Sequence, residues 1–164
     1  MDKISNTHRS PKEELKATKT LVIALVVQVA FFALISIFLF KELNAPLKLE
    51  GQLMRRNFFL LSVLIAIVCL AAAFNLYKKG IMALKNPSLL LEDKLIKYRV
   101  TLIKFIALCE GAAMFSVVIF FLTGLYETFF VTVILVLAML SKFPIAKKLA
   151  DELNLDWNER NELT

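Results

Sequence analysis

Four long apolar runs dominate the chain and restrict what it can fold into. They are LVIALVVQVAFFALISIFLF (21–40), FFLLSVLIAIVCLAAAFNLY (58–77), VTLIKFIALCEGAAMFSVVIFFL (100–122) and TFFVTVILVLAML (128–140). A helix needs roughly 20 mostly apolar residues to cross the hydrocarbon core of a bilayer, and the fourth run reaches this length once its flanking residues are included. Because 59% of the chain is hydrophobic, against about 45–50% in a typical soluble domain, we expect an integral membrane protein.

The expected fold class is all-α, a polytopic membrane protein with four transmembrane helices. We predict spans at about 20–40, 58–77, 100–122 and 126–142, within a transmembrane domain that covers 18–142. Residues 1–17 are expected to form a cytoplasmic tail, and residues 143–164 a cytoplasmic amphipathic helix and tail. The first apolar run is too long for a signal peptide and lacks a small-residue cleavage site.

The distribution of Lys and Arg predicts the orientation of the spans. With four spans, the regions 1–19, 78–99 and 142–160 lie on one side of the membrane, and together they hold fifteen Lys and Arg residues. The regions 41–57 and 123–127 lie on the other side and hold four. Since cytoplasmic loops carry the excess of Lys and Arg, both termini are expected to be cytoplasmic.

The connections predict two antiparallel helical hairpins. Only Thr123, Gly124 and Leu125 separate the third span from the fourth, so these two helices must pack side by side. Asn86 and Pro87 are typical of a helix start, and we expect the third helix to begin near Pro87 and to run into the membrane without a break.

The segment after the last span reads as one short amphipathic helix, with Ile145, Leu149 and Leu153 on one stripe. Such a helix either docks a partner protein or folds back onto the cytoplasmic connection of its own chain.

Glu110 is the most informative polar residue inside the membrane. It lies about ten residues into the third span, near the centre of the bilayer, where a charged group costs about 2.5–3.5 kcal/mol on insertion scales. Gln28 lies at a similar depth in the first span, and its amide could donate a hydrogen bond to Glu110 if the two helices are neighbours. Burial can also keep the carboxyl group neutral.

Small residues surround Glu110 at a spacing that permits close helix contact. Ala107 and Gly111 form one small-xxx-small pair, and Ala112 and Ser116 form another. Two functions fit this arrangement. The first is a non-catalytic membrane subunit or scaffold, in which a buried, protonated Glu110 fixes helix packing. The alternative is a proton- or cation-coupled transporter or channel component, in which Glu110 titrates, and this would require an oligomer.

Other classes of function lack their signatures in the sequence. No metal-ligand cluster, nucleophile elbow, phosphate-binding loop or carboxylate pair occurs, so we expect no enzymatic activity, no cofactor and no metal site. Cys69 and Cys109 lie within spans, without C-x-x-C spacing, and are expected to pack as small apolar residues. The positive-inside bias and the attraction of basic residues to anionic lipids explain the net charge of +6, so nucleic acid is not an expected partner.

Half of the chain resembles a group of small, uncharacterised bacterial membrane proteins with four spans. The resemblance rests on LEDKLIKYRVTLIKFIALCEGAAMFSVVIFFLTG (91–124), with its E-G-x-x-x-F motif and L-T-G end, and on FPIAKKLADELNL (143–155). It implies residence in the bacterial inner membrane. The expected partners are the lipid bilayer and either further copies of the chain or other subunits of a membrane complex.

A weaker similarity links the chain to the proteolipids of rotary ATPases, which also carry a carboxylate in helical hairpins. It implies that Glu110 carries the ion, with Gln28 as a ligand. The chain departs from that pattern at two points, because Glu110 lies on the first helix of its hairpin and the sequence contains only four glycines.

Overall fold

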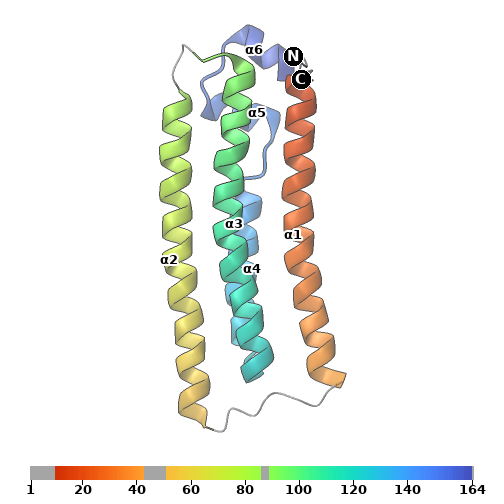
Figure 1. The fold of residues 1–164 in the computed structure, drawn as a ribbon, viewed down its shortest axis with the longest axis vertical. Helices are drawn as coiled ribbons and strands as arrows, with labels where there is room; N and C mark the ends of the chain where they lie inside the picture. Colours follow the sequence, from red (N-terminus) through yellow and green to blue (C-terminus); the bar gives the residue numbers. More distant parts are fainter. Residues whose placement is uncertain (1–9, 43–50, 86–88, 164) are drawn as a thin grey trace, which may run out of the picture.

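The computed structural model describes residues 10–42, 51–85 and 89–163. Three long helices lie side by side, a shorter fourth helix packs along α3, and two short helices cover one end of the bundle (Figure 1). The helices are α1 (Pro11–Glu42), α2 (Gln52–Leu84), α3 (Leu91–Thr123), α4 (Glu127–Ser141), α5 (Ala146–Glu152) and α6 (Trp157–Leu163). The start of α1, the end of α2, the start of α3 and both short helices lie at the same end, which we call the charged end.

Three of the helices, or four spans on a wider count, are long and apolar enough to cross a membrane. This holds for α1, α2 and α3, and for a fourth span if α4 and α5, which are bent by 77° relative to each other, are counted as one. At 1.5 Å per residue, a helix of 33 residues is about 50 Å long, well beyond the hydrocarbon core of about 30 Å. The prediction of an all-α polytopic membrane protein is therefore confirmed, and the surplus length carries α2 and α3 past the apolar layer.

The third helix is the centre of the bundle. Half of its most apolar 18-residue stretch is buried, against 17% for the corresponding stretches of α1 and α2. Leu102, Phe105, Ile106 and Cys109 are fully buried, because α3 packs against α1, α2 and α4 at once.

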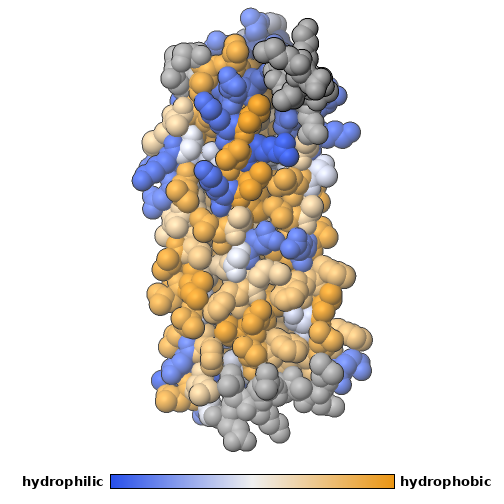
Figure 2. Space-filling view, in the orientation of Figure 1, coloured by the Kyte–Doolittle hydropathy of each residue, from blue (hydrophilic) through white to orange (hydrophobic). Residues whose placement is uncertain are grey.

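Large apolar side chains on the other helices point outward instead. Phe31 and Phe38 of α1, Leu64 of α2 and Phe130 of α4 are each about 60–70% exposed. Figure 2 shows the result on one face of the bundle as a broad apolar band, with most hydrophilic side chains gathered toward its ends. Such a band is the surface expected against lipid.

The hairpin between α3 and α4 is as tight as the sequence predicts. Gly124 ends α3 in the left-handed conformation, at φ 67°, and its N–H donates to the Phe120 carbonyl. A Cβ atom at this position would lie 2.8 Å from the Phe40 ring. Glycine is therefore required here both for its backbone angle and for space.

Two local predictions differ from the structure. The third helix begins at Leu91 rather than near Pro87, which lies outside the described residues. The segment after α4 forms two short helices rather than one, because the chain turns at Asn154, which has a positive φ of 50°.

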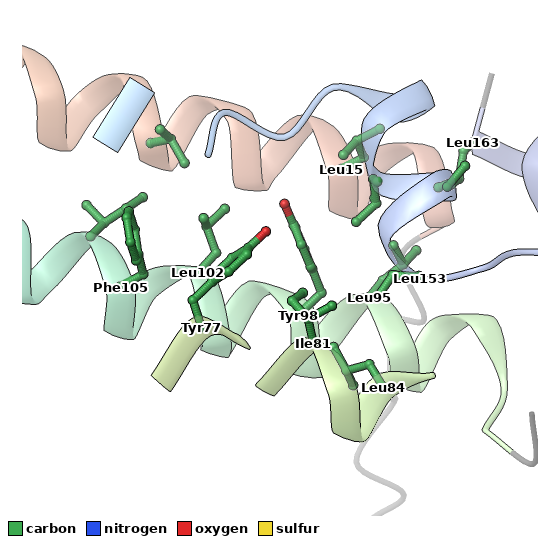
Figure 3. Close-up of a cluster of buried hydrophobic side chains, with 14 of the residues drawn as sticks. Leu15, Tyr77, Ile81, Leu84, Leu95, Tyr98, Leu102, Phe105, Leu153 and Leu163 are labelled. Atoms are coloured by element: carbon green, nitrogen blue, oxygen red, sulfur yellow. The ribbon is translucent and has the colours of Figure 1, made fainter. Parts of the chain in front are cut away.

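This C-terminal segment folds back onto the bundle. Leu149, Leu153 and Leu163 are buried, whereas Ile145 is exposed and does not share their stripe. Figure 3 shows Leu153 and Leu163 close to Leu15 of α1 and Leu95 of α3. The two short helices thus form part of the hydrophobic core at the charged end.

Candidate functional site

Glu110 and Gln28 lie at similar depth on neighbouring helices. Both α1 and α3 run away from the charged end (Figure 1), and each residue is near the middle of its helix. Glu110 is half-buried rather than buried, and Gln28 is exposed. No hydrogen bond joins the two side chains in the described part of the chain, so the predicted contact within one copy is not made.

The polar side chains at mid-height of the bundle face outward. Figure 2 shows a small hydrophilic patch at mid-height, over α1 and α3, surrounded by apolar side chains. An ionisable residue at this depth usually faces a bundle interior or a polar partner, because lipid cannot solvate it. Within one copy of the chain, the described residues do not enclose the polar side chains at mid-membrane.

The two small-residue pairs of α3 point in different directions. Ala107 and Gly111 are exposed, and a Cβ atom added at Gly111 would meet nothing within 4 Å. Ala112 and Ser116 are buried, with 2% and 0% of their surface exposed. The second pair therefore brings α3 close to its neighbours within the chain, whereas the first pair leaves a shallow strip of α3 open toward lipid.

Ser116 also holds α3 against α2 through a buried hydrogen bond. Its hydroxyl donates to the Ala112 carbonyl at 3.0 Å, so the Ser62 hydroxyl donates to Ser116 Oγ at 2.8 Å. Ser62 was not among the residues predicted from the sequence to form a contact. It is one serine in a long apolar run, and only its burial and its place opposite Ser116 reveal its role.

A second polar cluster fastens the C-terminal segment to the charged end, and the sequence analysis did not identify it. The Tyr77 hydroxyl of α2 donates to Glu152 Oε2 of α5 at 2.6 Å. Lys142 Nζ lies 3.8 Å from Glu152 Oε1 and 4.5 Å above the centre of the Tyr77 ring. Figure 3 shows the Tyr77 and Tyr98 hydroxyl groups directed into the space between the helices.

Two ion pairs extend this cluster. Lys94 of α3, with only 7% of its side chain exposed, donates to Glu159 of α6 at 2.9 Å. Arg99 of α3 donates to Glu14 of α1 at 3.3 Å. Burial opposes ionisation of Glu159, but the hydrogen bonds from Lys94 and from the Asp156 N–H, and the charge of Lys94, outweigh it. The pKa of Glu159 is therefore below its usual value.

The described residues contain no group of three or more His, Cys, Asp or Glu that could hold a metal ion. Neither Cys69 nor Cys109 forms a disulfide. Comparison of the chain with models of protein families, with curated proteins and with solved structures gave no match.

Proposed function

We propose that this polytopic membrane protein is a non-catalytic subunit of a membrane assembly, and that it associates through the outward face of α1 and α3 at mid-membrane. The observation that carries the proposal is that Gln28, Ala107 and Gly111 are exposed and Glu110 is half-buried, at similar depth on two neighbouring helices. We call these four residues the α1–α3 face. Glu110 then acts between chains, not as the buried packing residue expected from the sequence.

The lipid environment favours association at the α1–α3 face. Lipid tails offer no hydrogen bonds, so a polar side chain directed toward them gains from a partner helix. Small residues let another backbone approach closely, and the van der Waals packing that follows is one of the forces that drive helix association in membranes. Because an added Cβ at Gly111 would meet nothing within the chain, the space there is available to a second helix.

A second copy of the chain is the partner that fits this chemistry best. A glutamine amide carries two donor hydrogens, and a carboxyl group accepts hydrogen bonds. In a two-fold symmetric dimer, Gln28 of each copy can donate to Glu110 of the other, so that this contact forms twice. The similar depth of the two residues on parallel helices supports this exchange.

We also place the charged end on the cytoplasmic side. The fifteen basic residues of the three regions 1–19, 78–99 and 142–160 support this orientation. The resemblance to small bacterial membrane proteins supports the bacterial inner membrane as the location.

Disulfide cross-linking in membranes tests the proposal. In a background with Cys69 and Cys109 replaced by alanine, Gly111→Cys is expected to form a cross-linked dimer under mild oxidation. Val133→Cys is the matched control, because Val133 of α4 is 52% exposed but lies outside the α1–α3 face. Equal cross-linking at both positions, or none at position 111, would contradict the proposed dimer.

A further inference from the structure

The end of the bundle opposite the charged end contains a hollow that adjoins an apolar groove. The hollow has a volume of about 690 Å³, and its described lining residues are Gln52, Leu53, Arg55, Arg56, Phe59, Leu125 and Glu127. The groove has a volume of about 350 Å³ and runs between α2 and α4. Phe59 and Glu127 line both spaces, so the hollow and the groove adjoin each other.

The hollow favours an anion. Arg55 and Arg56 supply two guanidinium groups, and the first residues of both α2 and α4 line the hollow, so the positive ends of two helix dipoles point toward it. Glu127 is the one acidic residue among the described lining residues. It begins α4, where the helix dipole favours a negative charge, and no described ion pair joins it to either arginine.

One donor of Arg55, a residue that lines the hollow, lacks an acceptor. The Nε atom of Arg55 is buried and has no hydrogen-bond partner. Nearly all buried polar atoms in proteins are hydrogen-bonded, and an exception calls for a ligand, a water or an ion. A phosphate oxygen is the acceptor that an arginine fork suits best.

The groove has the dimensions and the lining for an acyl chain. Apart from Glu127, its walls are apolar side chains, among them Val63 and Ile67 of α2 and Phe130 and Ile134 of α4. From Phe59 to Leu70 it extends about 17 Å along α2, at 1.5 Å per residue. This length is close to one leaflet of the hydrocarbon core, which is about 15 Å thick.

We infer that the adjoining hollow and groove together bind an anionic phospholipid, with its phosphate at Arg55 and Arg56 and one acyl chain between α2 and α4. The lipid would come from the leaflet at the end of the bundle opposite the charged end. This site lies on α2 and α4 and is separate from the α1–α3 face.

The test uses the purified full-length protein in detergent and native mass spectrometry. Phosphatidylglycerol and phosphatidylethanolamine with identical acyl chains are titrated in parallel. We expect phosphatidylglycerol to bind about tenfold more tightly, and Arg55→Gln to remove most of this preference, since charge-assisted hydrogen bonds are the stronger kind. Lys41→Gln is the control, because Lys41 is an exposed basic residue at the same end of the bundle.

A second pair of variants tests the groove. Ile134 lines the groove and Leu137 does not, yet both lie on α4 and are 57% and 60% exposed. Ile134→Trp is expected to weaken phosphatidylglycerol binding severalfold, and Leu137→Trp to leave it unchanged, with helix content checked by circular dichroism.

Three results would overturn the inference. The first is equal binding of the two lipids, and the second is an equal effect of Arg55→Gln and Lys41→Gln. The third is a loss of binding in Arg55→Gln with no loss in Ile134→Trp, together with displacement of the lipid by millimolar inorganic phosphate. That combination would show a site for free phosphate without a place for a lipid chain.

Discussion

Replacing Tyr77 with phenylalanine is expected to loosen the C-terminal segment while leaving the transmembrane bundle intact. The change removes a single hydroxyl group, which donates to Glu152 Oε2 at 2.6 Å and so links α2 to α5. A hydrogen bond to a charged group contributes about 1.5–3 kcal/mol. Because the Glu152 side chain is 23% exposed, water can replace part of the lost bond, and we expect the lower end of this range.

A cost of about 1.5 kcal/mol corresponds to a rise of roughly tenfold in the population of the undocked segment. Hydrogen exchange measured by mass spectrometry in lipid nanodiscs would report this rise as faster exchange in residues 146–163, with exchange in α3 unchanged. Tyr126→Phe is the control, since Tyr126 is 56% exposed at the opposite end of the bundle. If exchange in 146–163 rises no more in Tyr77→Phe than in Tyr126→Phe, the reasoning about this hydrogen bond is wrong.

Three further changes test other contacts. Folding lowers the pKa of Glu159. The ionised carboxylate therefore stabilises the fold fully above its unfolded pKa of about 4.3, and this stabilisation is lost as the pH falls through the lower pKa of the folded chain. We expect hydrogen exchange in α6 to accelerate below about pH 4, and Glu159→Gln to abolish that acceleration. Ser62→Ala removes the buried donor to Ser116 and is expected to lower the free energy of unfolding by about 0.6 kcal/mol, the average for such bonds in membranes, with Ser141→Ala as an exposed control in a denaturation assay. Gly124→Ala forces a side chain into a left-handed backbone position against Phe40 and should lower the free energy of unfolding by more than about 1 kcal/mol in the same assay. Gly111→Ala should change the free energy of unfolding of the isolated chain little. Equal losses in the two variants would contradict the described turn.

The approximate positions of the three long helices could be predicted because the bilayer itself sets a length for apolar runs, whereas the fourth predicted span is the shorter α4 and reaches that length only together with α5. The three residues between the third and fourth spans also predicted their hairpin. The start of α3 was misplaced because Pro87 is favourable at a helix start, yet Leu91 is where helical hydrogen bonding begins, with the Lys94 N–H donating to the Leu90 carbonyl.

Which face of each long helix is buried against the other helices could not be predicted in the same way. In a helix that is apolar all around, periodicity does not distinguish the side facing other helices from the side facing lipid. Ala107 with Gly111 and Ala112 with Ser116 therefore looked equivalent in sequence, although the first pair is exposed and the second buried. The contact between Tyr77 and Glu152 joins residues far apart in the chain, and no local pattern announces such a pairing.

The most direct test of the proposed assembly is the dimerisation equilibrium of the full chain in bilayers, measured by energy transfer between labelled copies at decreasing protein density. We predict a reversible dimer that Gly111→Ile weakens at least tenfold, that Glu110→Leu also weakens, and that Glu110→Gln largely preserves, because an amide can still exchange hydrogen bonds with Gln28. Ile96→Leu, on an exposed part of α3 nearer the charged end, should leave the equilibrium unchanged. A chain that stays monomeric at every density, or a dimer indifferent to Gly111→Ile and Glu110→Leu, would contradict the account.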